Sequence, residues 1–184
     1  MTPEDSVKSL STAKRLRFNS SYLALQYAGN IGFLSLGIGY TAPRDKYQLS
    51  LVYGYAPPSL AGAHIHTVTA KNIFPLYRFY LNRKQTLIPY GAIGLSLELG
   101  GRSFFRQPSN MPDSYYDFPK SVHLIPATGV KLRHITDHQR HLHGYEFFLE
   151  ITSVDVYVWY KLTSDKIRTQ QILSLAGGVH FLIK

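Results

Sequence analysis

The chain lacks the features that mark several common protein classes. Its 184 residues include no cysteine, which excludes disulfide bonds and thiolate metal sites. No run approaches the ~18 uninterrupted apolar residues of a membrane-spanning helix, so a helical membrane protein is excluded. No glycine-rich loop leads from a strand into a helix, and nucleotide binding therefore has no support in the sequence.

Acidic residues are also scarce, because 11 Asp and Glu stand against 20 Lys and Arg, a formal net charge of +9. A basic chain can bind nucleic acid or an anionic membrane surface. No strand carries a basic stripe, however. The basic residues gather at the N-terminus and in predicted turns, and they include Lys14, Arg15, Arg17, Arg44, Lys46, Arg83, Lys84, Lys166 and Arg168. We interpret them as contacts with solvent or lipid headgroups and expect no nucleic-acid partner.

The chain is rich in alternation between large apolar residues and small or polar ones, most clearly between Phe33 and Tyr55. A period of two predicts β-strands with two different faces. The short polar break between two such runs predicts an antiparallel hairpin. The apolar positions are Leu34, Leu36, Ile38 and Tyr40, then Tyr47, Leu49, Leu51, Tyr53 and Tyr55.

The direction of this apolar face distinguishes two kinds of barrel. A soluble barrel turns its apolar residues inward, whereas a barrel in lipid turns them outward. Here one face is apolar and ends in tyrosines, while the other is mostly small and polar, which is typical of a barrel in lipid. The 14 tyrosines agree, because a tyrosine ring suits the boundary between membrane and water.

The same alternation predicts eight strands after residue 20. They are residues 20–28, 31–41, 46–56, 64–81, 86–99, 122–133, 145–161 and 170–183. The phase changes near Lys71-Asn72 and near Thr152-Ser153, where a β-bulge would restore it. Strand lengths near the ~9–11 residues that cross a bilayer, and an even strand number, favour a closed barrel. We therefore predict an all-β fold: an eight-stranded antiparallel up-and-down transmembrane β-barrel over residues 20–184, with a long loop at 100–120.

Two interpretations of residues 1–19 stay open: a short amphipathic helix at a membrane surface, or a tail without fixed structure. The sequence Thr2-Pro3-Glu4-Asp5 is typical of a helix start, and Val7, Leu10 and Ala13 recur at every third position. The segment has no apolar core of the kind that a signal peptide needs. We expect the sequence to be a mature form without its signal peptide.

The strand pattern resembles the small eight-stranded outer-membrane β-barrels of Gram-negative bacteria. This group includes the OmpA transmembrane domain, OmpX and the lipid A-modifying barrels, and the resemblance is one of architecture over residues 20–184. It implies a place in the outer membrane, with outer-membrane lipid, lipopolysaccharide or another envelope protein as the partner. Such barrels usually end in an aromatic residue. Val179 and Phe181 match that pattern, and Leu182, Ile183 and Lys184 follow.

Inward-facing charges and an aromatic loop are the first candidate functional features. Charges inside a narrow barrel must pair, and we interpret those on the predicted inner face as a structural salt-bridge network: Lys131, Glu146, Glu150, Asp155 and His180. The loop at 100–120 is long enough to suggest a function. Its aromatic residues predict packing against a partner: Phe104, Phe105, Tyr115, Tyr116 and Phe118.

A hydrolytic site at the end of two strands is the alternative. Ser121 and His123 lie two residues apart and therefore share one strand face, and Glu98 ends the neighbouring strand. A hydroxyl, an imidazole and a carboxylate are the parts of a hydrolytic triad. The barrel-type lipid A deacylases are similar in using Ser, His and Glu on strands. Their order is His-x-Ser, whereas this chain has Ser-x-His.

Two histidine clusters complete the candidates. His138, His141 and His143 lie in a polar turn, and His64 and His66 share a strand face. Histidine clusters can ligate metals. We interpret the first cluster as solvated and the second as hydrogen-bonded to the barrel, and we expect no metal and no cofactor.

The expected function is that of an outer-membrane β-barrel with a structural or interaction role in the cell envelope, presenting residues 100–120 to a partner or to lipopolysaccharide. The first alternative is a lipid A-modifying acyl hydrolase that uses Ser121, His123 and Glu98. The second is a soluble ligand-binding barrel of the lipocalin type. It requires the apolar faces at Leu34/Leu36/Ile38 and Leu49/Leu51/Tyr53 to point inward around a cavity.

Overall fold

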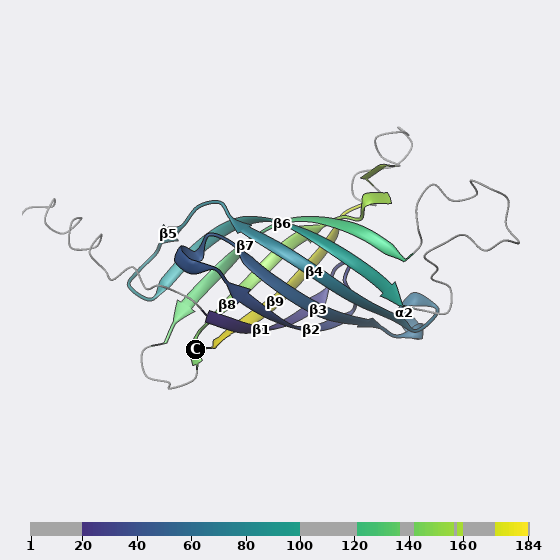
Figure 1. The fold of residues 1–184 in the computed structure, drawn as a ribbon, viewed down its shortest axis with the longest axis horizontal. Coiled ribbons are helices and arrows are strands. Elements are labelled where there is room, and N and C mark those ends of the chain that lie inside the picture. The colour runs from purple at the N-terminus through teal and green to yellow at the C-terminus, as the bar shows by residue number, and fades with distance from the viewer. Residues whose placement is uncertain (1–19, 100–120, 137–141, 157, 160–171, 184) are drawn as a thin grey trace, which may run out of the picture.

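The computed structural model describes residues 20–99, 121–136, 142–156, 158–159 and 172–183 (Figure 1). Two short helices, η1 (Pro43–Asp45) and α2 (Pro58–Ala61), lie in connections between strands. The strands are β1 (Ser20–Ala28), β2 (Leu34–Thr41), β3 (Gln48–Ala56), β4 (Ile65–Pro75), β5 (Phe79–Tyr80), β6 (Gln85–Leu99), β7 (Val122–Ile135), β8 (Leu142–Thr152) and β9 (Ser174–Ile183).

The sheet closes on itself into an eight-stranded antiparallel barrel, which confirms the predicted strand number and topology. Neighbours pair in the order β4, β3, β2, β1, β9, β8, β7, β6, and β4 also pairs with β6 to complete the ring. The two-residue β5 continues the line of β4 along β6, since Pro75 lies opposite Tyr90 and Phe79 lies opposite Leu87. The step from Pro75 to Phe79 is four residues, whereas the step from Tyr90 to Leu87 on β6 is three. One extra residue is therefore accommodated between β4 and β5.

The barrel has two unlike ends, which lie at opposite sides of Figure 1. The terminal end holds the start of β1, the end of β9, η1 and the turn between β5 and β6. The loop end holds the turn between β1 and β2, α2, the end of β6 and the start of β7. Ile31 lies in the turn between β1 and β2 and is buried with Val52 and Ile125 inside the barrel. Because Ile31 belongs to this turn, β2 begins at Leu34, later than the predicted strand at 31–41.

The predicted bulge at Lys71-Asn72 is wrong. The register of β4 with both of its neighbours is continuous through these residues. Thr69, Lys71 and Ile73 therefore all face inward. The irregularity follows Pro75 instead, at the point where the chain leaves the sheet and Arg78 turns toward η1.

The predicted long strand at 145–161 is also wrong at its end. β8 stops at Thr152, and residues 155–156 and 158–159 are helical. The Val158 N–H donates a hydrogen bond to the carbonyl of Val154 at 3.1 Å, so the chain turns into a helix and leaves the sheet. No bulge carries the strand past Ser153, and Asp155 does not lie on an inner strand face.

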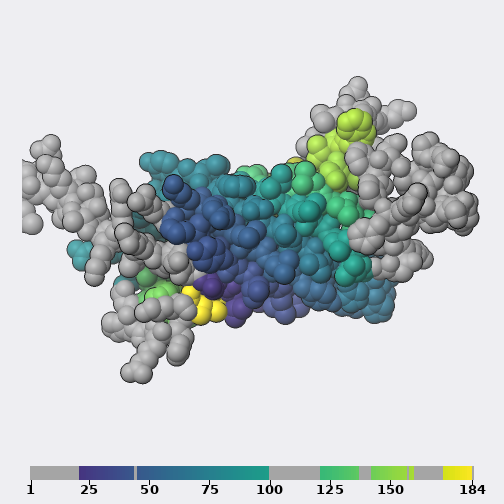
Figure 2. All heavy atoms as spheres, in the orientation of Figure 1, coloured from purple at the N-terminus to yellow at the C-terminus, as the bar shows by residue number. Residues whose placement is uncertain are grey.

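Alternate residues of each strand face opposite sides of the wall. In β3, Gln48 and Ser50 are buried, whereas Leu49 and Leu51 are 43% and 52% exposed. In Figure 2 the atoms of β2, β3 and β4 make a continuous outer wall on the visible side. The apolar faces at Leu34/Leu36/Ile38 and Leu49/Leu51/Tyr53 all point outward. The requirement of the lipocalin-type alternative is therefore not met.

Several predictions concern residues outside the described part of the chain. These residues are the segment 1–19, the five aromatic residues of the 100–120 loop, His138 and His141. Within the described part, no helix is long and apolar enough to cross a membrane.

Candidate functional site

Glu146 of β8 is the centre of a polar network in the barrel interior. Its side chain is fully buried, and Arg133 donates to its Oε1 through Nε at 2.6 Å. Lys131 Nζ lies 3.6 Å from its Oε2, and His180 Nδ1 lies 3.2 Å from the same oxygen. Gln48 Nε2 lies 3.4 Å from both carboxylate oxygens of Glu146. The side-chain amide oxygen of Gln48, Oε1, accepts a hydrogen bond from Lys131 Nζ. Four strands thus meet at one carboxylate.

Asp45 of η1 closes this network at the terminal end. The Arg133 guanidinium donates to both oxygens of Asp45, at 2.7 and 3.1 Å, while it also contacts Glu146. This two-pronged geometry is the strong form of an arginine–carboxylate pair. Arg78 approaches the same carboxylate at 3.4 Å and donates to the Asp45 backbone carbonyl. The turn between β2 and β3 is therefore held over the end of the barrel by two arginines.

A second ion pair lies deeper in the barrel. Lys71 Nζ of β4 is 2.6 Å from both carboxylate oxygens of Glu150 on β8. The Tyr90 hydroxyl donates to the same carboxylate at 2.8 Å. All three residues are buried, so this pair is shielded from solvent.

Aromatic rings fill the space between the charged groups. Tyr22 stacks on His180 with ring centroids 4.5 Å apart, and Phe148 lies 4.8 Å from the same imidazole. Lys131 Nζ lies 4.8 Å from the centre of the Tyr90 ring, a favourable cation–π distance. Gly39 of the neighbouring strand β2 leaves space for the Tyr22 ring, because a Cβ at this position would collide with the ring.

The interior network combines three cations with three anions. Lys71, Lys131 and Arg133 face Asp45, Glu146 and Glu150. The interior of an eight-stranded barrel is just wide enough for side chains to fill, and here the side chains filling it neutralise one another. Among the described residues, no three His, Cys, Asp or Glu side chains are grouped as a metal site requires. The described side chains thus form an ion-paired core.

The structure brings four of the five predicted network residues into this core: Lys131, Glu146, Glu150 and His180. The fifth, Asp155, lies in the helical turn after β8. Sequence reasoning missed Asp45, Lys71 and Arg133, which supply half of the six charges. Arg133 could have been found, because it lies two residues after Lys131 on the same strand face. Asp45 carried no such signal, since it lies in a turn.

The residues of the predicted hydrolytic triad lie on adjoining strands at the loop end. The Glu98 N–H donates to the Ser121 carbonyl at 2.7 Å. The Ser121 side chain is buried, and the residue is 1% exposed. A carboxylate oxygen of Asp155 lies 3.5 Å from His123 Nδ1. Asp155 also accepts a hydrogen bond from the Leu124 N–H at 3.1 Å. The Asp155 carboxylate, predicted on the inner face of a strand, therefore lies beside His123 and is held by the Leu124 N–H.

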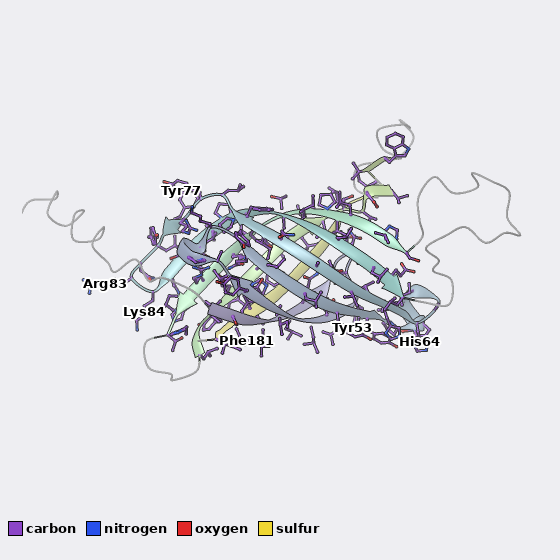
Figure 3. All side chains as sticks on the ribbon, viewed as in Figure 1. Tyr53, His64, Tyr77, Arg83, Lys84 and Phe181 are labelled. Carbon is purple, nitrogen blue, oxygen red and sulfur yellow. The ribbon has the colours of Figure 1, made fainter. Side chains whose placement is uncertain are left out.

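Tyrosines and histidines form a second cluster on the outer face at the loop end. The Tyr53 hydroxyl lies 2.5 Å from His66 Nδ1, and the Tyr55 hydroxyl lies 2.8 Å from His64 Nδ1. The Tyr55 and His66 rings are 5.1 Å apart. Figure 3 shows Tyr53 and His64 close together at the end of the barrel that carries α2. We call Tyr53, Tyr55, His64 and His66 the Tyr–His cluster.

Comparisons of the chain with protein families, curated proteins and solved structures found no match. The likeness to small outer-membrane barrels is therefore one of architecture alone: a closed, all-antiparallel, eight-stranded barrel.

Proposed function

We propose that the protein is a transmembrane β-barrel of a Gram-negative outer membrane, with a structural or interaction role in the cell envelope. The observation that carries the proposal is the inversion of its two faces. The interior is charged and ion-paired, while the wall exposes large apolar side chains such as Leu36, Ile38 and Leu51 at 52–62%. Exposed apolar surface on this scale marks contact with a partner or a membrane.

The arrangement of exposed aromatic residues supports a bilayer as that environment. Aromatic rings favour the two membrane–water boundaries, where an apolar body meets a polar edge. Tyr53 lies toward the loop end and Tyr77 toward the terminal end (Figure 3). Exposed aromatic residues toward the loop end include Tyr27, Phe33 and Tyr53, and those toward the terminal end include Tyr40, Tyr47, Phe74, Tyr77, Phe79, Tyr80 and Phe181; Phe147 and Trp159 are exposed as well.

The role within the envelope is inferred from the interior. Ion pairs cross the interior of the barrel, so we do not propose transport of solutes. We therefore expect partners to bind at the outer surface and at the connections of the loop end. We propose outer-membrane lipid or lipopolysaccharide as the partner, or a second envelope protein that contacts residues 100–120.

A lipid acyl hydrolase is not proposed, because no observation favours Ser121 as its nucleophile. The hydroxyl of a nucleophilic serine must reach the substrate and a general base. Ser121 is 1% exposed, so its side chain is not presented at the surface.

The test compares folding of the full chain in detergent and in plain buffer. A barrel made for lipid folds in detergent and migrates differently on a gel before and after boiling. In plain buffer it stays aggregated, because its apolar wall has no cover. A soluble, folded monomer in buffer without detergent would contradict the proposal.

A further inference from the structure

An apolar groove of about 530 Å³ crosses the outer face of β1, β2, β3 and β4. This volume lies within the ~300–1,000 Å³ of sites that hold small ligands. Its outward-facing lining consists of Leu23, Leu36, Ile38, Leu51, Tyr53 and Val68.

The groove lies between two rows of outward-facing side chains. In one row Leu23 lies opposite Ile38, and Ile38 lies opposite Leu51. In the other row Leu36 lies opposite Tyr53, and Tyr53 lies opposite Val68. The second row is the one nearer the loop end.

The Tyr–His cluster lies directly beyond this second row. Tyr55 and His66 are paired across β3 and β4. Tyr55 lies two residues after Tyr53, and His66 lies two residues before Val68; Tyr53 and Val68 both line the groove. His64 follows at the start of β4, where it is exposed. An apolar groove and a polar cluster are thus continuous on one face of the barrel.

The hydrogen bonds within the cluster prepare the histidines to bind an anion. A phenol hydroxyl is a good donor and a neutral imidazole nitrogen a good acceptor. When Tyr53 and Tyr55 donate to the Nδ1 atoms, each ring carries its proton on Nε2. Each Nε2–H is then a donor for a further group. Two donors follow, one from His64 and one from His66.

We propose that this surface binds an anionic phospholipid, with an acyl chain in the groove and the headgroup phosphate at His64 and His66. The inference deepens the proposed function, on which it rests, because it names a lipid that the barrel wall selects. The groove and the Tyr–His cluster contain no acidic side chain, so no carboxylate in them repels a headgroup phosphate. The net charge of +9 also favours an anionic lipid.

The test measures retention of phosphatidylglycerol and of phosphatidylcholine with identical chains by the full protein in neutral detergent. Native mass spectrometry gives the number of lipids bound and the apparent affinity. We expect phosphatidylglycerol to bind tighter than phosphatidylcholine. His64→Phe/His66→Phe, which keeps both aromatic rings and removes both donors, should weaken phosphatidylglycerol binding by at least about tenfold, the factor expected from losing a single hydrogen bond to a charged group. Val68→Trp, which fills the groove, should weaken binding of both lipids.

The matched control is His134→Phe at the terminal end. His134 also stacks on a tyrosine, Tyr145, with centroids 5.1 Å apart, but it is not part of the groove lining. We expect this variant to bind lipid as the parent protein does. A loss equal to that of the double variant would show that the effect is not specific to the Tyr–His cluster, which would overturn the site.

Other outcomes separate this inference from the proposed function. Equal affinity for both lipids in a protein that folds in detergent would overturn the phospholipid site and leave the membrane barrel standing. Preferential binding of lipopolysaccharide would also overturn the phospholipid assignment. Folding in plain buffer without detergent would overturn both proposals. Each variant is first checked for heat-modifiable migration, and His64→Phe alone serves if the double variant does not fold.

Discussion

At the scale of single residues, the buried ion pairs decide which substitutions the barrel tolerates. A buried pair adds little net stability, because desolvation of its two charges offsets their attraction. Removing one partner is costly, since it leaves a charge buried and unpaired. Lys71 and Glu150 are such a pair: their side chains are 7% and 0% exposed.

We predict that Glu150→Gln lowers the free energy of unfolding by about 3 kcal/mol, because the Lys71 ammonium loses its counter-charge. Glutamine can still accept the hydrogen bond from Tyr90, so the effect isolates the charge. The double variant Lys71→Met/Glu150→Gln should lose less stability than Glu150→Gln alone, because no unpaired ammonium remains. Urea titration in detergent micelles measures each value.

The contradicting outcome is additivity. If the double variant loses the sum of the two single losses, the two side chains are not coupled. Their 2.6 Å contact would then contribute nothing to the free energy of unfolding. Asp155→Asn is the control outside the barrel core. We expect it to cost less than about 1 kcal/mol, because Asp155 is partly exposed.

At the scale of the element, β3 shows how one strand serves two environments. Leu51 is 52% exposed and lies near the middle of the strand, while Tyr47 lies just before its start. We predict that Leu51→Arg costs about 2–4 kcal/mol in lipid bilayers and that Tyr47→Arg costs about 0–1 kcal/mol. The reason is that the cost of a charge facing lipid falls from the midplane to the interface. Urea unfolding in bilayers measures both values.

A soluble barrel gives the opposite result. An arginine at an exposed position of a water-facing strand changes stability by less than about 0.5 kcal/mol. Equal, small effects at Leu51 and Tyr47 would therefore argue that the apolar wall does not face lipid.

The turn between β1 and β2 makes β3 sensitive on its inner face as well. A Cβ added at Gly54 would meet the Ile31 carbonyl oxygen and lie 2.6 Å from Thr67 Oγ1. We predict that Gly54→Ala costs about 1–3 kcal/mol, the usual range for overpacking. Thermal or urea unfolding in micelles provides the measurement.

Gly91→Ala in β6 is the matched control, because a Cβ there meets nothing within 4 Å. We expect no loss of stability in this variant. A loss as large as that of Gly54→Ala would mean that glycine is needed in these strands for a reason other than close packing of Ile31.

At the scale of the whole molecule, closure of the sheet and filling of its interior act together. Pairing of β4 with β6 removes the unpaired strand edges, as lipid requires. Inside, side chains from β3, β4, β6, β7, β8 and β9 meet in one ion-paired network. The described part of the molecule is thus a closed wall around an ion-paired interior.

We predict that the protein reconstituted in a planar bilayer shows no single-channel conductance, because the charged core leaves no continuous water path. A porin reconstituted in the same way serves as the positive control. Steady, reproducible conductance steps from the folded protein would contradict a filled interior.

Local pattern was enough to predict the strands wherever both faces of a strand differ. Residues 20–28 were predicted with the bounds that the structure has for β1. Pattern failed at Thr152, because the end of a strand depends on where its neighbours stop pairing. β7 pairs with β8 only as far as Ala127 opposite Thr152, and Val154, Val156 and Val158 continue the apolar alternation without a strand.

The sequence by itself determined the fold class and the outward direction of the apolar face. Side-chain direction along a strand alternates with the backbone, so a period of two is visible in any short stretch. Only the tertiary structure decided which charges meet. Gln48 and Glu146 are 98 positions apart, and Arg133 and Asp45 are 88 apart. Ring closure sets these contacts, and no local pattern contains them.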